Sequence, residues 1–152
     1  IRFFICGEQT KNISNFLKLM KCKKLIRQRK IIVVNKFINL NEENTVFRVS
    51  DLTWLIYKNS SLGSSGVLYL SSKARIPIIT SKNGIPHLLN QKFKLGPSVN
   101  LTDKTKISKV LNDLSLKNTN YKHYKSKITK FGQKNFVENF YLKILNKLND
   151  LR

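Results

Sequence analysis

Acidic residues are scarce in this chain: Asp and Glu total 8 against 29 Lys and Arg, a formal net charge of +21. Such an excess of one sign favours anionic partners, namely nucleic acid, lipid headgroups or phosphorylated ligands. Lysine far outnumbers arginine and is spread along the chain, whereas nucleic-acid-binding proteins usually gather arginine and aromatic residues on one face. Nucleic acid is therefore disfavoured as a partner. An anionic membrane surface is compatible with the charge, and so is a lysine-rich surface that has no specific partner.

Cysteine is almost absent as well. The two thiols, Cys6 and Cys22, cannot build a disulfide framework, which favours a reducing compartment. Cys6 lies in an apolar run, where we expect a small buried side chain. Cys22 lies among lysines, an environment that favours a reactive thiol.

Long apolar runs and catalytic or metal-binding clusters are also missing from the sequence. No apolar segment has membrane-spanning length and no signal peptide is recognisable, so we expect a cytoplasmic protein, peripheral to a membrane at most. His87 and His123 have no partner at a useful spacing, so both are expected to be structural or surface residues. No Ser-His-Asp, Cys-His or zinc constellation can be assembled, and the sequence therefore assigns neither a catalytic residue nor a metal site.

The chain does contain enough apolar residues for a folded core, because 41% of its 152 residues are hydrophobic. Apolar runs typical of strands occur at residues 1–6, 31–34, 52–57 and 76–79, with room for a brief strand within 95–101. Segments with helical character separate or follow them, at residues 12–27, 41–49, 67–73, 87–94, from 102 onward and from about 133 onward. This alternation predicts an α/β fold: a Rossmann-like parallel sheet with helices on both faces and a C-terminal helical extension.

The N-terminal strand and helix have distinct patterns. Residues 1–6 are nearly continuously apolar, which suits a strand buried on both faces. In the helix expected at 12–27, one stripe is apolar and the opposite side carries lysines; the stripe consists of Ile13, Phe16, Leu17 and Met20. We expect the stripe to dock on the sheet with the lysines in water. Taken alone, the segment would also suit the surface of a membrane.

The most informative stretch runs from residue 60 to residue 84. Its small-residue turn, Gly63-Ser64-Ser65-Gly66, lies between a strand and a helix and so belongs to a βαβ unit. A helix start carries unpaired N–H groups and a partial positive charge, and small residues let an anion approach them. Ligands of parallel sheets bind beyond the carboxyl ends of the strands. We therefore predict a diphosphate cradle from Gly63 to Val67; the alternative is an ordinary capped helix that follows a loop.

The order of these pieces resembles the C-terminal, nucleotide-sugar-binding half of GT-B-fold glycosyltransferases. The best-matching motifs are Gly63-Ser64-Ser65-Gly66-Val67-Leu68, which resembles the phosphate-loop helix, and Arg75-Ile76-Pro77-Ile78-Ile79, which resembles the strand after it. Further similar segments lie at residues 1–7, 31–43, 50–57, 83–88, 95–96 and 136–141. The resemblance covers nearly the whole chain. It implies a glycosyltransferase whose substrate is a nucleotide sugar and which needs no cofactor or metal, since amides and a helix terminus offset the diphosphate charge.

The resemblance also implies residue roles. The diphosphate would be held by Gly63, Ser64, Ser65, Gly66 and Val67. Lys36 and Phe37 would lie near the nucleobase. Asn83 and Gly84 would lie near the sugar, although a simple turn explains these two residues equally well.

Departures from the family pattern qualify this expectation. Many retaining members carry two glutamates around the phosphate-loop helix, whereas the corresponding positions here are Leu62 and Leu70, which indicates a divergent branch. The family's phosphate-binding Arg and Lys, and its acceptor-binding half, would precede Ile1. We therefore expect residues 1–116 to be a donor-binding domain without its first βα unit, followed by a connecting segment and helix at 117–152. Such a chain would be inactive alone, as a fragment of a longer enzyme. A basic nucleic-acid-binding module and a nonenzymatic partner subunit are the alternatives.

Overall fold

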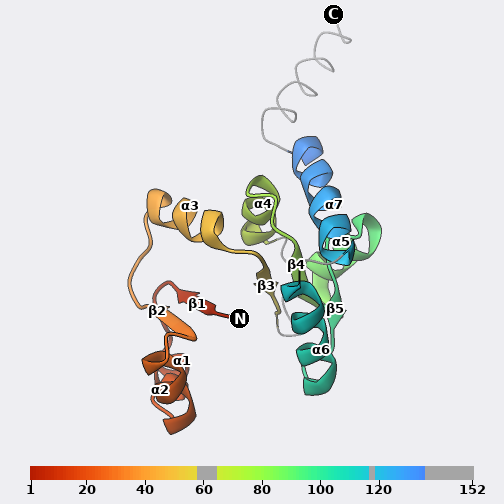
Figure 1. Ribbon diagram of the computed structural model, residues 1–152. Helices are drawn as coiled ribbons and strands as arrows, with labels where there is room; N and C mark the ends of the chain where they lie inside the picture. Colours follow the sequence, from red (N-terminus) through yellow and green to blue (C-terminus); the bar gives the residue numbers. More distant parts are fainter. Residues whose placement is uncertain (58–64, 117–118, 136–152) are drawn as a thin grey trace, which may run out of the picture. The chain divides into compact units, whose positions relative to one another are not determined.

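The computed structural model describes residues 1–57, 65–116 and 119–135 (Figure 1). Contacts divide the chain into two compact units, Ile1–Val49 and Ser50–Arg152. The division falls after residue 49, within residues 1–116, and the assignment of those residues to one donor-binding domain stays a prediction. In each unit parallel strands alternate with helices, which confirms the α/β class.

The first unit pairs two parallel strands. β1 (Phe3–Cys6) runs alongside β2 (Ile31–Val34), in register from Phe3 opposite Ile31 to Cys6 opposite Val34. α1 (Lys11–Leu17) and α2 (Met20–Arg27) connect the strands, and α3 (Leu40–Val49) follows β2. The prediction that residues 1–6 are buried on both faces is wrong: Phe3 and Phe4 are 42% and 40% exposed, since β1 is an edge strand of a two-stranded sheet in the described part of the chain.

The helix predicted at residues 12–27 is two helices. The backbone at Leu19 is extended (φ −60°, ψ 144°), and its N–H bonds to the carbonyl oxygen of Phe16 in a tightened last turn of α1. This interruption shifts the helical phase, so the predicted stripe is not buried as a whole. Leu17 is buried, but three other stripe positions are exposed: Ile13, Phe16 and Met20. The expected docking of that stripe is therefore wrong.

The second unit is built on a sheet of three parallel strands in the order β3 (Thr53–Leu55), β4 (Ile78–Ser81) and β5 (Ser98–Val99). α4 (Gly66–Lys73) connects β3 to β4, and α5 (Gly84–Phe93) connects β4 to β5. α6 (Lys104–Ser115) and α7 (Thr119–Asn135) follow. The βαβ unit predicted around residues 52–79 is confirmed. The segment at 117–130, predicted as a connection, lies largely within α7, and most of the helix predicted from about residue 133 lies outside the described residues.

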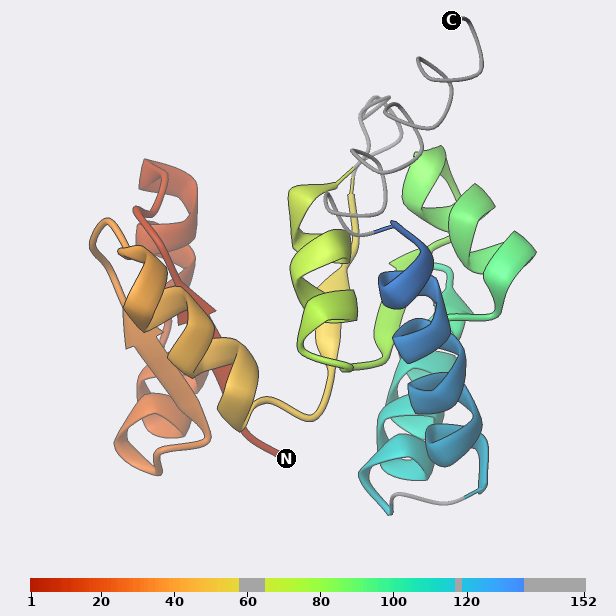
Figure 2. The same ribbon diagram turned by 90° about the horizontal axis from the view of Figure 1, so that it is seen from above.

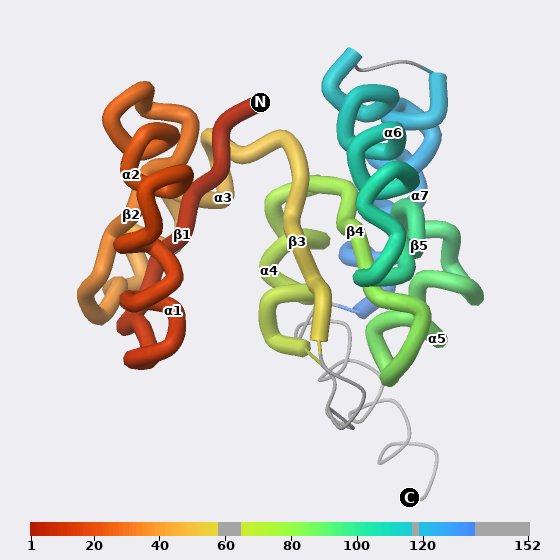
Figure 3. The backbone as a smooth tube through the Cα atoms, turned by 90° about the horizontal axis from the view of Figure 1, so that it is seen from below, coloured from red at the N-terminus to blue at the C-terminus, as the bar shows by residue number. Residues whose placement is uncertain are grey.

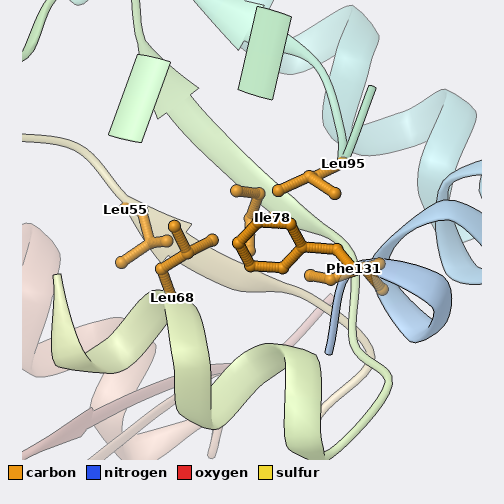
Figure 4. Packing of buried hydrophobic residues seen from close by; sticks show 6 residues of the cluster. Leu55, Leu68, Ile78, Leu95 and Phe131 are labelled. Carbon is orange, nitrogen blue, oxygen red and sulfur yellow. The ribbon is translucent and has the colours of Figure 1, made fainter. Parts of the chain in front are cut away.

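Two consecutive residues of β4 belong to two different apolar clusters, one on each face of this sheet. Ile78 packs with Leu55, Leu68, Leu95, Ile128 and Phe131 (Figure 4). Ile79 belongs to the other cluster, together with Val99, Leu114 and Tyr121. Helices thus cover both faces: α4, α5 and the later turns of α7 on one, α6 and the first turn of α7 on the other (Figure 2).

Two glycines let backbone segments of this unit approach closely. A Cβ atom on Gly132 would lie 2.8 Å from the carbonyl oxygen of Ser72, so α7 packs directly against α4. A Cβ atom on Gly96 would collide with the backbone of Ile78, so the chain that enters β5 passes tightly against β4. These contacts fix the helices and β5 around the central strand.

Candidate functional site

Two helices of the second unit begin at the same edge of its sheet. β3 and β4 are parallel, and α4 and α5 follow them at Gly66 and Gly84 respectively. Figure 3 shows both strands running toward the edge where these helices start. The first N–H groups of a helix have no partner within the helix, and the terminus carries a partial positive charge. This edge, from the ends of β3 and β4 to the starts of α4 and α5, is therefore the candidate anion site.

The described part of the predicted cradle begins at Ser65. Ser65 is buried (7% exposed) and precedes α4 as its N-cap residue, but its side chain makes no capping bond. Instead, its hydroxyl lies 2.7 Å from the hydroxyl of Tyr57. This pair ties the chain just after β3 to the start of α4. The hydroxyl of Ser65 therefore holds the helix start in place without capping it, and its role in binding a diphosphate stays a prediction.

Gly66 and Val67 are more accessible than Ser65. Both are exposed, and a Cβ atom built on Gly66 would meet no other atom of the described residues within 4 Å. Among the described residues, the first residue of α4 therefore faces unfilled space, which an anion could occupy next to the helix amides. Gly63 and Ser64, the first half of the predicted cradle, lie outside the described residues.

Asn83 and Gly84 form the start of α5. Asn83 is the N-cap residue in an extended conformation (φ −152°, ψ 163°), and its side chain makes no capping bond. Gly84 has a φ of +77°, a left-handed conformation that residues other than glycine adopt at a cost. Both residues are half-buried at the edge that also carries the start of α4. The structure thus places the predicted sugar-side residues and the described cradle residues on one edge.

Lys36 and Phe37 belong to the first unit, directly after β2. Phe37 is 77% exposed. The ammonium of Lys36 pairs with the carboxylate of Glu42. This bond to Lys36, together with the backbone N–H of Asn39, lowers the pKa of the Glu42 carboxyl below its ordinary value. Lys36 is therefore engaged by an acid of its own unit.

A polar network that the sequence did not reveal lies beside the start of α5. The side-chain nitrogen of Asn90 donates to the carbonyl oxygen of Gly96 at 2.9 Å and lies 3.0 Å from Ser98 Oγ and 3.1 Å from Thr80 Oγ1. Its oxygen accepts the N–H of Gly96 at 2.9 Å. Ser98 Oγ in turn lies 3.0 Å from both Thr80 Oγ1 and His87 Nδ1.

This network gives one histidine a structural partner. His87, which has no partner at a useful spacing in the sequence, contacts Ser98, 11 positions away, as suits the structural or surface residue that was expected. No short-range motif could signal the pair, because only the parallel pairing of β4 with β5 brings Thr80 opposite Ser98 under α5. The four side chains fix α5 to the strands below it and leave the His87 ring half-buried.

The two thiols differ from expectation. Cys22 is buried (7% exposed), so its lysine neighbours in sequence do not make it an accessible thiol. Cys6, predicted to be buried, is only partly so, and its burial raises the pKa of its thiol. Neither cysteine lies at the candidate edge of the second unit.

Within residues 1–57, 65–116 and 119–135, no three His, Cys, Asp or Glu side chains come together as metal ligands would. None of the helices described in these ranges combines the length and the apolar character needed to cross a lipid bilayer.

No model of a known protein family matches the chain, and no curated protein matches it.

Proposed function

We propose that the carboxyl edge of the β3-β4-β5 sheet binds the diphosphate of a nucleotide sugar, and that the chain supplies the donor-binding part of a glycosyltransferase. The observation that carries this proposal is the opening of α4 and α5 at one edge of a parallel sheet, with space at Gly66 that no described residue fills. This is the layout in which α/β proteins bind phosphorylated ligands.

The charge balance at this edge suits a diphosphate. Each helix start contributes a partial positive charge of roughly half an elementary charge, and its first amides can donate to phosphate oxygens. When a glycosyl group is transferred, negative charge develops on the departing nucleoside diphosphate. Amides that are already oriented toward it stabilise that charge without a metal ion. In this proposal the amides of Gly66 and Val67 carry out that role.

The remaining residues have supporting roles. Ser65 anchors the start of α4 through Tyr57, which keeps the first amides oriented. Asn83 and Gly84, at the start of α5 on the same edge, would lie on the sugar side. The nucleobase roles of Lys36 and Phe37 remain part of the proposal and need a separate test, because these residues belong to the first unit.

Gly66 offers the sharpest test. Gly66→Asp would place a carboxylate in the open space beside the amides, where the diphosphate is proposed to lie. An acidic residue in the first turn stabilises a helix, so loss of binding cannot be attributed to a weakened α4. Gly66→Asn has the same shape without the charge and is the matched control. UDP, GDP and ADP, free and as nucleotide sugars, would be titrated calorimetrically into the full chain.

We expect Gly66→Asp to weaken binding at least about tenfold, which corresponds to ~1.4 kcal/mol, while Gly66→Asn stays within about threefold of the parent. If Gly66→Asp and Gly66→Asn bound nucleotides with equal affinity, the proposal that the diphosphate lies at the start of α4 would be wrong. If no nucleotide binds but RNA binds with a steep dependence on salt, the basic nucleic-acid module replaces the glycosyltransferase.

A further inference from the structure

The break between α1 and α2 exposes large apolar side chains. Ile13 and Phe16 lie one turn apart on α1, Leu19 lies in the break, and Met20 opens α2. Their exposed fractions are 43%, 58%, 55% and 84% respectively. The N–H of Leu19 donates a hydrogen bond to the carbonyl oxygen of Phe16, so the break begins directly after the last turn of α1. We call these four residues the apolar corner.

Basic residues are dense in the segment that contains the apolar corner. Residues 11–30 contain no acidic residue and eight basic residues, all of them exposed: Lys11, Lys18, Lys21, Lys23, Lys24, Arg27, Arg29 and Lys30. Exposed large apolar side chains and exposed cations thus occur together within 20 consecutive residues that form two short helices.

We propose that the apolar corner inserts into the headgroup region of an anionic lipid membrane while the surrounding lysines bind lipid phosphates. The exposed apolar side chains and the exposed cations together call for a binding partner that carries both apolar and anionic groups. The interface of an anionic bilayer offers both: acyl chains accept the apolar side chains, and headgroups attract the basic ones. This inference is independent of the nucleotide site, which belongs to the second unit.

Other occupants fit the pattern less well. A second copy of the chain would bring eight cations against eight cations, which opposes association through this surface. RNA would neutralise the lysines but would leave the aliphatic side chains of Ile13, Leu19 and Met20 in water, because base recognition uses stacking on aromatic and arginine side chains. Both alternatives are distinguished by the experiment.

The experiment measures binding of the full chain to vesicles of 70% phosphatidylcholine and 30% phosphatidylglycerol, with pure phosphatidylcholine vesicles alongside. Phe16→Ser/Met20→Ser tests the apolar corner, and Leu40→Ser/Leu116→Ser is its control, since these residues are 66% and 78% exposed elsewhere. Lys21→Gln/Lys23→Gln/Lys24→Gln tests the charge. Its control is Lys104→Gln/Lys106→Gln/Lys109→Gln, three exposed lysines of α6.

We expect binding to the anionic vesicles only, and a loss of about tenfold for each test variant but not for its control. Phe16→Trp combined with Trp54→Phe would report insertion directly, because the emission of the introduced indole should shift to the blue on anionic vesicles. Trp54 is the chain's single tryptophan. The proposal is overturned if the parent chain ignores anionic vesicles or if both lysine triples weaken binding equally. It is also overturned if the serine pair binds like the parent, or if RNA binding, rather than vesicle binding, depends on the α2 lysines.

Discussion

Ser98 Oγ lies 3.0 Å from His87 Nδ1 and joins the first residue of β5 to the first turns of α5. The same oxygen lies 3.0 Å from the amide nitrogen of Asn90, which can only donate. Ser98 therefore accepts from Asn90 and has one hydrogen of its own to give. Thr80, 3.0 Å away, can supply a further hydrogen to Ser98. Two directions fit these contacts: Thr80 donates to Ser98 and Ser98 to His87, or His87 donates to Ser98 and Ser98 to Thr80. We infer the first, in which Nδ1 of His87 is an acceptor.

This pattern predicts the tautomer of His87. Neutral His87 should carry its proton on Nε2, because Nδ1 accepts from Ser98. Long-range ¹H–¹⁵N NMR spectra, recorded at a pH where the ring is neutral, distinguish the two nitrogens. Ser98→Ala should reduce the preference for this tautomer, whereas Thr102→Ala, which changes an exposed hydroxyl beyond β5, should not. An Nδ1–H tautomer in the parent chain would mean that the hydrogen bonds run in the opposite direction.

Asn90 should be the most costly polar residue of the second unit to remove. It is 3% exposed and pairs with both the N–H and the carbonyl oxygen of Gly96. Asn90→Ala would leave buried polar groups without partners, and we expect the second unit to lose about 2–4 kcal/mol of unfolding free energy. Urea denaturation, followed by the fluorescence of Trp54, measures the change. Gln91→Ala, on the exposed side of the same helix, is the control and should change stability little; similar losses in both variants would contradict the role of Asn90.

Local patterns of the sequence predicted most strands and helices of both units, but not the break at Leu19 or the exposure of the apolar residues in the first unit. The apolar run at 76–79 and the turn before residue 67 depend on neighbours in sequence, so the βαβ unit could be predicted. The pairing of Ser98 with His87 depends on strand register and could not be. In the first unit, the stripe from Ile13 to Met20 obeys helical spacing, but the spacing counts only in an unbroken helix. The extended backbone at Leu19 interrupts it, and neither proline nor glycine marks that position.

The polar composition of residues 119–130 also made α7 difficult to predict from the sequence. Residues 119–130 include four lysines and few apolar residues, which suggested a connecting segment that is at most partly helical. Tyr121, Ile128, Phe131 and the small Gly132 are buried against the core of the second unit, and Tyr124 packs against it partly buried. One narrow buried stripe is therefore enough to hold this helix against the core. Because exposed lysines dominate its composition, the composition alone does not indicate a packed helix.

Gly132 should tolerate no side chain. A Cβ atom there would lie 2.8 Å from the carbonyl oxygen of Ser72, so Gly132→Ala must push α7 away from α4. Although alanine favours helix, we expect a net loss of about 1–3 kcal/mol, typical of overpacking in a close-packed interior. Gly66→Ala gains the same helix preference and meets no atom within 4 Å, so it should be neutral or slightly stabilising. Urea denaturation compares the two; equal stability of both variants would show that α7 can shift without cost.

Glu42 should make the first unit sensitive to acid. Asn39 and Glu42 form a reciprocal cap at the start of α3: the Asn39 side chain accepts the N–H of Glu42 at 3.0 Å, and Glu42 accepts the N–H of Asn39 at 3.2 Å. Because Lys36 and this cap lower the pKa of Glu42, its stabilising contribution is present above the ordinary carboxyl pKa and is lost as the pH falls through the lowered one.

A pH series of denaturation curves tests this sign. The parent should exceed Glu42→Gln in stability at neutral pH, and the two should converge in acid. Glu43→Gln removes the same charge from the same turn and is the control for the helix dipole. Direct ¹³C NMR titration of the Glu42 carboxyl should give a pKa below that of a model peptide. A difference between parent and Glu42→Gln that grows in acid would reverse the assignment.

Cys6 should react with an alkylating reagent before Cys22, although the sequence suggested that Cys22 is the more reactive thiol. Cys22 lies among lysines but is 7% exposed, so an alkylating reagent reaches it only when the first unit opens. Cys6 is partly accessible, and burial raises the pKa of its thiol, so its alkylation should begin at a higher pH than that of a free thiol.

Cys6→Ser and Cys22→Ser leave one thiol each and allow iodoacetamide labelling, read by mass spectrometry, to follow them separately. We expect Cys6 to react first under native conditions and at a rate that rises with pH, and Cys22 to react at the rate of unfolding. Rapid native labelling of Cys22 would mean that the face of α2 that carries this thiol packs more loosely than its 7% exposure indicates.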